Sequence, residues 1–381
     1  TKVVSPERVL RLKASCRRIR SESPILRCKN TVIPESVTTI GRSAFEDCAG
    51  LKTIHIPDSV TYLGSGAFYS CYRIKDLTIG DGLTHIGNGA FNGCNNLGTV
   101  TLGKNVESVG EMAFYSSGIN EIILSDSTTS LGYCAFTFCN GLSKIHIGKS
   151  LSDFGNSDIN RAGQLTEITL NEENENFTLQ NGILYNKDKT VLLLYPAGRN
   201  NTTYTISESV ETIDSYAFYN CTVLSSVDYK GSIKDWCNIS FGDLESNPLY
   251  YANNLYIQGN KVESLEILDG ISTLKPYVFA GGNFEHVVLD NSVRTINPYV
   301  FYGAKMKTVT IGNGVQTIAA NTFYNCTNLS KILLPPALQT IGWSNKIWLD
   351  RIQCLSKIVS TVICLGFAVV VIVFFCKSLC A

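Results

Sequence analysis

The chain has 381 residues, of which 44% are hydrophobic, and its 32 Lys and Arg side chains balance 32 Asp and Glu side chains. A chain of this length can bury an extended hydrophobic core. The formal net charge of zero lacks the bulk positive charge typical of nucleic-acid-binding proteins, so nucleic acid is not an expected partner.

Residues 1–30 form a basic N-terminal segment, with nine Lys or Arg against two Glu. Within it the stretch SPERVLRLKASCRRI places Val9, Leu12, Cys16 and Ile19 on one side of a possible amphipathic helix. We interpret the segment as a cap for the repeats that follow. A helix that binds a membrane surface or nucleic acid is the less favoured alternative.

A phenylalanine recurs through most of the chain at spacings of 22 or 23 residues within each run. The members of this series are Phe45, Phe68, Phe91, Phe114, Phe136, Phe218, Phe279, Phe301 and Phe323, with Ile159 in the same slot. A period of about 20–29 residues around a short strand is typical of a leucine-rich-repeat solenoid. The sequence therefore predicts an α/β-type repeat solenoid, a right-handed coil with a parallel β-sheet on one face and stacked phenylalanines inside its convex side.

Each repeat has a short strand and a turn. Motifs such as Leu51-x-x-Ile54-x-Ile56 alternate inward and outward, as strands of a sheet must. Glycine ends most of the Ser-Val-x-x-Ile-Gly turns, which suggests a backbone geometry that disfavours a Cβ atom. Asp214 and Asn297 in the same slot suggest a left-handed conformation, which Lys275 and Ala319 do not fit. The glycines of this slot are Gly41, Gly64, Gly87, Gly110, Gly132 and Gly155.

Cysteine follows the phenylalanine by three residues in many repeats, at Cys48, Cys71, Cys94, Cys139, Cys221 and Cys326. Ser117, Ala162, Gly282 and Ala304 fill the slot elsewhere, so it requires a small residue. Side chains stacked in this way point in one direction and do not face one another. We therefore expect buried, reduced thiols in preference to disulfides or metal ligands, and no metal or cofactor.

The pattern Ile-Pro-x-Ser-Val-x-x-Ile-Gly-x-x-Ala-Phe-x-x-Cys-x-x-Leu resembles the BspA-like leucine-rich repeat, which occurs in surface proteins of mucosal bacteria and anaerobic protists. The resemblance covers roughly residues 31–342. It implies repeats at 31–170, 204–229 and 261–342, separated by insertions at 171–203 and 230–260. It also implies an exposed ectodomain with a role in adhesion.

The two insertions have different sequence patterns. In the first, Ile183 to Tyr185 and Val191 to Tyr195 flank an Asn-Lys-Asp-Lys turn, which predicts a β-hairpin. The second is rich in aromatic residues and is a candidate contact surface. Its aromatic side chains could equally cover an edge where the coil is irregular. The candidate contacts are Trp236, Tyr250, Tyr251 and Tyr256.

Residues 358–375 form an uncharged apolar run of 18 residues that predicts one transmembrane helix, between a juxtamembrane segment at 343–357 and a short tail at 376–381. Lys346, Arg351 and Lys357 precede the run and Lys377 follows it, so the flanking charges favour cytosolic repeats. The family resemblance implies the opposite orientation. We expect a single-pass plasma-membrane protein with extracellular repeats, because large folded domains translocate largely regardless of flanking charge. Seven Asn-x-Ser/Thr sequons are compatible with a glycoprotein.

Outward positions of the predicted strands form two columns across the sheet. We expect a broad polar face that binds a protein or glycoprotein ligand. The candidate ligand-binding residues are Thr53, His55, Asp76, Thr78, Thr99, Thr101, Glu121, Lys144, His146, Glu167, Thr308, Thr310 and Lys331.

The four histidines are scattered along the chain, and no motif predicts an active site, so we expect no enzymatic activity. The predicted function is a membrane-anchored surface protein that binds macromolecules in adhesion to host cells, matrix proteins or other cells. The alternative is a tail-anchored intracellular protein-interaction scaffold.

Overall fold

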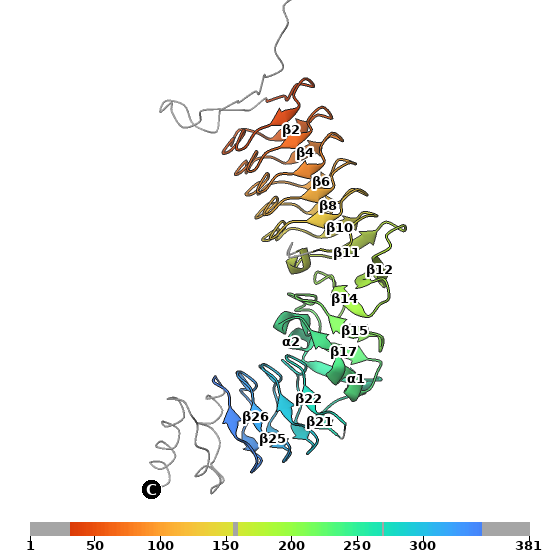
Figure 1. Ribbon diagram of the computed structural model, residues 1–381, viewed down its shortest axis with the longest axis vertical. Coiled ribbons are helices and arrows are strands. Elements are labelled where there is room, and N and C mark those ends of the chain that lie inside the picture. Colours follow the sequence, from red (N-terminus) through yellow and green to blue (C-terminus); the bar gives the residue numbers. More distant parts are fainter. Residues whose placement is uncertain (1–30, 155–158, 269, 345–381) are drawn as a thin grey trace, which may run out of the picture. The chain divides into compact units, whose positions relative to one another are not determined.

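The computed structural model describes residues 31–154, 159–268 and 270–344, and the chain divides into two compact units, residues 1–199 and 200–381. Each unit is a parallel β-solenoid of leucine-rich-repeat type, in which successive coils contribute strands that pair in parallel (Figure 1). The predicted cap at 1–30 and the predicted membrane helix at 358–375 lie outside the described residues. Among the residues that are described, no helix is long and apolar enough to cross a membrane.

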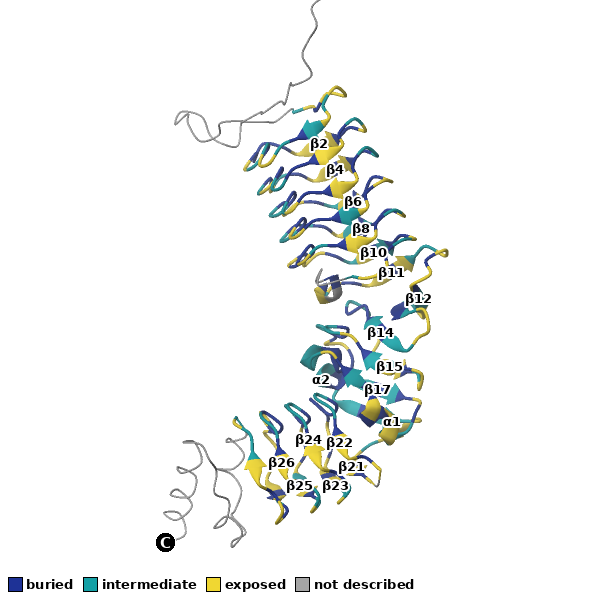
Figure 2. Ribbon diagram, in the orientation of Figure 1, coloured by how far each residue is buried: buried dark blue, intermediate teal, exposed yellow. Residues whose placement is uncertain are grey.

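The sheet of the first unit is formed by the strands that the alternating motif predicts. β2 pairs in parallel with β4, and β6, β8, β10 and β11 form a second parallel ladder. Exposed and buried residues alternate along these strands, as Figure 2 shows. The strands are β2 (Thr53–Ile56), β4 (Asp76–Ile79), β6 (Thr99–Thr101), β8 (Glu121–Ile123), β10 (Lys144–Ile147) and β11 (Glu167–Leu170).

Short strands also form in the segments that the sequence predicts as turns. They consist of two residues each, and their apolar second residue points into the core. Stacked coils bring the backbones of these segments together, and pairing satisfies their N–H and C=O groups. These strands are β1 (Thr39–Ile40) with β3 (Tyr62–Leu63), and β5 (His85–Ile86) with β7 (Ser108–Val109) and β9 (Ser130–Leu131).

The phenylalanines stack inside each coil as predicted. Phe68 and Phe91 are fully buried, with ring centroids 5.4 Å apart and ring planes inclined by 4°. The backbone follows the same stacking, because the N–H of Phe68 donates to the carbonyl of Ala90 in the next coil at 2.8 Å. A 3-10 helix, η2 (Ile159–Arg161), carries the buried Ile159 in the same slot.

The left-handed conformation that Asp214 and Asn297 suggest is not the reason for the recurrent glycine. Of the described residues in this slot, none has a positive φ, including those two. A Cβ on Gly87 would instead lie 2.4 Å from the carbonyl oxygen of Leu63 in the preceding coil. The close approach of neighbouring coils therefore accounts for glycine at Gly64, Gly87, Gly110 and Gly132, whereas a Cβ on Gly41 would meet nothing within 4 Å. Gly155 lies outside the described residues.

Left-handed backbone occurs at two other positions of each coil, two residues before and two residues after the phenylalanine. These residues curve the chain around the aromatic ring at an energetic cost that only glycine escapes. The earlier positions are Ser43, Gly66, Gly89, Met112, Cys134, Tyr216, Tyr277, Tyr299 and Asn321. The later ones are Asp47, Ser70, Gly93, Ser116, Phe138, Asn220, Gly281, Gly303 and Asn325.

The cysteines that follow the phenylalanines are buried, and none forms a disulfide within the described residues. Burial raises the pKa of the Cys139 thiol to about 11, which keeps it protonated at neutral pH. The predicted reduced thiols are thus the state that the structure contains.

The first insertion forms a three-stranded antiparallel meander. β13 (Ile183–Asn186) pairs with β14 (Val191–Leu194) around the turn identified from the sequence. β12 (Phe177–Gln180), which the sequence pattern does not indicate, pairs with the other edge of β13. The side chain of Phe177 stacks on Phe154 with ring centroids 5.4 Å apart, so the meander continues the core of the coils.

The second unit repeats the two-ladder arrangement of the first. Its larger sheets contain β15 (Thr203–Ile206), β17 (Ser226–Tyr229), β19 (Asn254–Ile257) and β20 (Asn260–Lys261), and separately β21 (Ser264–Ile267), β23 (His286–Leu289), β25 (Thr308–Ile311) and β27 (Lys331–Leu333). Its short strands are β16 (Thr212–Ile213), β18 (Ser240–Phe241), β22 (Thr273–Leu274), β24 (Thr295–Ile296), β26 (Thr317–Ile318) and β28 (Thr340–Ile341).

The second insertion is an enlarged coil that keeps its place in the stack. Its strand β19 pairs in parallel with β17, and β18 pairs in parallel with β16. Helix α1 (Ile233–Asn238) is capped by Ser232, which forms a capping box with Asp235. A 3-10 helix, η3 (Leu244–Ser246), and a short helix, α2 (Leu249–Ala252), complete the coil.

Candidate binding surface

The outward residues of the first unit form two straight columns, which we call the strand face. Parallel pairing aligns Glu121, Lys144 and Glu167 in the first column and Ile123, His146 and Thr169 in the second. Side chains two residues apart on a strand point to the same side of the sheet, so both columns face outward together. The predicted positions on β2, β4 and β6 are exposed, whereas Glu121 and His146 are half-buried by their neighbours in the column.

Neighbouring coils are linked along the columns by polar contacts. Lys144 Nζ lies 2.9 Å from Glu167 Oε2, and this ion pair, together with the Glu121 carboxylate, holds the pKa of Lys144 above its usual value. Thr99 Oγ1 donates to Glu121 Oε2 at 3.1 Å. The result is a charge-mixed patch with two carboxylates around one ammonium group.

Histidine and threonine form a second kind of contact along the strand face. His146 Nδ1 lies 2.9 Å from Thr169 Oγ1 in the next coil, and in the second unit His286 Nδ1 lies 2.8 Å from Thr308 Oγ1. Each contact joins residues that are direct partners in the parallel ladder. The histidines are therefore oriented by neighbouring hydroxyl groups.

The second unit has its own strand face. Thr308 aligns with Lys331 in one column, and Thr310 lies between Val288 and Leu333 in the other. Val288 and Leu333 are 39% and 40% exposed, so this part of the column combines two apolar side chains with the hydroxyl group of Thr310, and Glu266 on β21 aligns with Val288. The strand face of the second unit therefore presents apolar as well as polar side chains.

Tyr256 belongs to the strand face, although the sequence placed it with the insertion contacts. It aligns with Asp228 on β17, which in turn aligns with Thr205 on β15. Polar and apolar residues alternate in strands such as Ser226–Tyr229, and this pattern could have identified the outward positions of these coils. The irregular repeat spacing around the insertion obscures the pattern in the sequence. The strand-face positions missed in this way are Thr203, Thr205, Ser226, Asp228, Asn254, Ser264 and Glu266.

Trp236 is not a surface contact, which corrects the prediction. It is fully buried, packs against Tyr229 and Phe241, and donates its Nε1–H to the carbonyl of Val278 at 2.9 Å. An indole that is both buried and hydrogen-bonded belongs to the core. For Trp236 the alternative prediction therefore holds, in which the aromatic side chain covers an edge where the coil is irregular.

Tyr250 and Tyr251 are half-buried on α2, with ring centroids 5.1 Å apart and nearly perpendicular planes. The hydroxyl of Tyr251 donates to Glu245 Oε1 at 3.3 Å, and burial raises the pKa of this phenol. Only part of each ring thus remains available to a partner.

The strand face has the chemistry of a recognition surface. Its ionisable groups lie at exposed or half-buried positions, and within the described residues no group of three His, Cys, Asp or Glu side chains is placed to hold a metal ion. The described part of the protein is thus defined as a leucine-rich-repeat solenoid with an exposed, charge-mixed sheet surface.

The chain belongs to the BspA-type leucine-rich-repeat family. The BspA type leucine rich repeat region matches in six copies, over residues 25–127, 64–189, 197–260 and 252–346. Leucine-rich repeats generally form binding scaffolds, and these matches cover most of the chain. No curated protein sequence matches it.

Several solved bacterial structures have a similar fold. A leucine-rich repeat protein from Eubacterium ventriosum is 24% identical, with 77% of this chain and 82% of that chain covered and a TM-score of 0.58. A leucine rich cell surface protein from Faecalibacterium prausnitzii is 23% identical, with 84% and 87% covered and a TM-score of 0.52. The pneumococcal vaccine antigen PcpA is 19% identical, with 83% of each chain covered and a TM-score of 0.52.

Proposed function

We propose that this protein is a membrane-anchored cell-surface protein whose strand face binds a protein or glycoprotein ligand in adhesion. The observation that carries the proposal is the alignment of exposed polar side chains across consecutive coils. Such a surface is wide and shallow, which suits a macromolecule better than a small substrate. Two proteins of similar fold, a cell surface protein and a vaccine antigen, support display outside the cell.

The charge-mixed patch indicates the kind of ligand surface that would fit. Glu121 and Glu167 flank Lys144, so the patch keeps one negative charge in excess. A ligand with a basic side chain opposite this patch would gain complementary contacts, chiefly through faster association and orientation. We therefore expect salt to weaken ligand capture by this face.

The first experiment replaces the patch in the full-length protein. The triple substitution Glu121→Ala, Lys144→Ala and Glu167→Ala removes charges without removing buried apolar groups. We expect weaker adhesion of cells to immobilised matrix proteins and host-cell monolayers. The matched control is Asp81→Ala with Lys104→Ala, which removes an exposed ion pair of 2.7 Å in the turns outside the strand face. Equal adhesion of both variants and the wild type would exclude the patch.

Membrane anchoring through residues 358–375 rests on their apolar, uncharged sequence. Protease treatment of intact cells, followed by antibody detection of residues 31–342, tests the orientation. Loss of the repeats from intact cells supports surface display. Protection of the repeats until the cells are permeabilised would favour the intracellular scaffold instead, which the basic residues before the apolar run support.

A further inference from the structure

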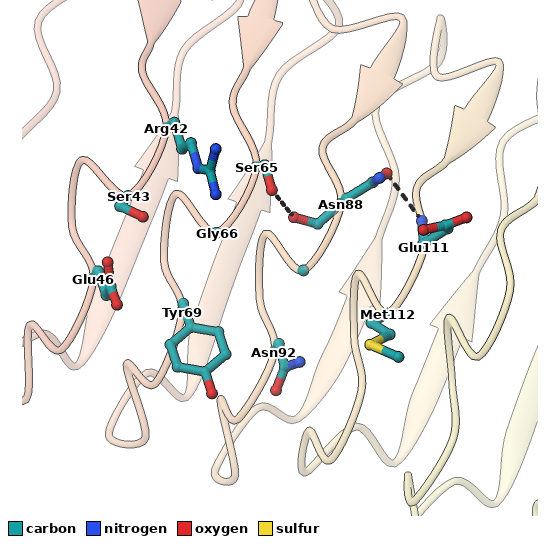
Figure 3. Close-up of a pocket in the computed structure, with 11 residues that line it drawn as sticks. Arg42, Ser43, Glu46, Ser65, Gly66, Tyr69, Asn88, Asn92, Glu111 and Met112 are labelled. Atoms are coloured by element: carbon teal, nitrogen blue, oxygen red, sulfur yellow. Dashed lines mark hydrogen bonds between the residues drawn. The ribbon is translucent and has the colours of Figure 1, made fainter.

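A groove lined largely by polar residues lies away from the strand face, beside the phenylalanine turns of the first four described coils. It has a volume of about 320 Å³, near the lower end of the range of about 300–1,000 Å³ for small-molecule sites. Figure 3 shows Ser65, Asn88 and Glu111 along one side, and Glu46, Tyr69, Asn92 and Met112 along the other. Arg42 lies at the end beside Ser65.

The groove exists because two coils lack a side chain at the left-handed position before the phenylalanine. Gly66 and Gly89 fill this position in adjacent coils, whereas Ser43 precedes them and Met112 follows them. Among the described coils, the same slot elsewhere holds Cys, Tyr or Asn. The two glycines thus form the floor of the groove, and side chains at this slot bound it at both ends.

The walls present hydrogen-bonding groups that the protein does not use internally. In residues 31–154, no hydrogen bond or ion pair engages the side chains of Arg42, Glu46 or Asn92. The amide oxygen of Asn88 accepts the N–H of Glu111 at 3.1 Å, which orients the amide and leaves its NH₂ group as a donor. Tyr69 adds an aromatic ring that is 41% exposed.

The backbone of the groove is not available to an extended peptide. Gly66 N–H donates to the carbonyl of Asn88 at 2.8 Å, and Gly89 N–H donates to the carbonyl of Glu111 at 2.7 Å. Strand addition requires unpaired backbone groups, and here neighbouring coils already pair them. A ligand must therefore be recognised by the side chains.

We propose that this groove binds a short neutral oligosaccharide. Sugar hydroxyl groups both donate and accept, which matches the planar Asn, Arg and Glu groups of the walls. The apolar face of a pyranose ring can pack on Tyr69. The groove is lined by one guanidinium group and two carboxylates, which gives no excess positive charge for a phosphate or sulfate group. The site is separate from the strand face, and its ligand class differs from the protein surface proposed there.

Saturation-transfer NMR on the full-length protein in lipid nanodiscs tests the proposal, with cellobiose, lactose, N,N′-diacetylchitobiose and mannobiose as probes. We expect saturation of at least one disaccharide. Gly89→Met should weaken this binding by about tenfold or more, which corresponds to about 1.4 kcal/mol. The substitution places in the groove the residue that the next coil carries at Met112. A Cβ on Gly89 meets Asn92 Cβ at 3.9 Å, so space for it exists, while its φ of 61° makes the substitution cost backbone strain that the control at Gly93 shares.

Gly93→Ser is the matched control, because Gly93 also has a positive φ, lies in the same coil, and aligns with Ser70 and Ser116 in the neighbouring coils. It should bind sugar as the wild type does. Tyr69→Ala provides a second test that adds no side chain and should also reduce binding by about tenfold. The triple substitution on the strand face should leave sugar binding unchanged, which separates the two proposals.

Three results would overturn the proposal: no saturation of any disaccharide, undiminished binding by both Gly89→Met and Tyr69→Ala, or stronger binding of a sulfated disaccharide or a peptide than of every neutral sugar. If thermal unfolding followed by circular dichroism shows that Gly89→Met does not fold, Tyr69→Ala decides the outcome.

Discussion

The thiol of Cys71 donates a hydrogen bond to the backbone carbonyl of Phe45, one coil earlier, across 2.9 Å. The same contact joins Cys94 to Phe68 and Cys326 to Phe301, at 3.3 and 3.0 Å. A cysteine at this position fills a small space and also supplies a donor to a buried carbonyl. This explains why the slot often holds cysteine while accepting alanine or glycine in other coils.

Buried thiols make the protein sensitive to alkaline pH. The pKa of Cys139 is raised by burial from 9.0 to about 11, so the folded state holds this proton more tightly than the unfolded state does. The resulting stabilisation is complete below about pH 9 and is lost as the pH rises towards 11. Urea unfolding between pH 8 and 11 should therefore show a steeper loss of stability in the wild type than in Cys139→Ala. Parallel pH profiles of the two proteins would contradict this account.

Removal of one stacked phenylalanine should damage the core strongly. Phe91 is fully buried between Phe68 and Phe114, so we expect Phe91→Ala to lower the free energy of unfolding by about 3–5 kcal/mol. Phe45 has only one stacked neighbour among the described residues and is 6% exposed, so Phe45→Ala should cost less. Urea denaturation measures both. An equal cost for the two variants would show that stacking on both sides adds nothing.

The loss of stability on replacing the recurrent glycine should depend on the close approach of neighbouring coils, and not on a left-handed backbone. Gly87→Ala places a Cβ 2.4 Å from a backbone oxygen and should destabilise the protein by about 1–3 kcal/mol. Gly98→Ala is the control, because its Cβ meets nothing closer than 3.8 Å and should change stability by less than about 0.5 kcal/mol. Thermal unfolding compares them, and similar melting temperatures would refute the steric explanation.

Trp236 should act through folding and not through ligand contact. Trp236→Phe leaves the carbonyl of Val278 without its indole donor and should cost about 1–3 kcal/mol of stability. Adhesion by the folded fraction should be unchanged, because the indole is fully buried. Binding measured per folded molecule, with folding followed by circular dichroism, checks the two effects separately. Loss of adhesion without loss of stability would show that Trp236 contacts the ligand.

Much of the strand face could be predicted because its pattern is local. Alternation over four residues is enough to place Lys144 and His146 on the outward side, and the repeat period places Glu121 and Glu167 beside Lys144. The pattern fails at the second insertion, where Tyr256 returns to the column after an enlarged coil. The spacing of residues in the sequence cannot show that the strand after this coil pairs in register with the strand before it, because α1 and α2 contain the extra residues.

The amino-acid sequence by itself determined the period, the buried phenylalanine series and the inward faces of the longer strands, because each follows from the regular recurrence of apolar residues. Only the tertiary structure decided why Gly87 must be glycine, that Trp236 is buried, and that Gly66 and Gly89 leave a groove. These features depend on contacts between coils. Two chain segments must be stacked before the distance from a Cβ atom to the neighbouring backbone, or the space left by a missing side chain, has any meaning.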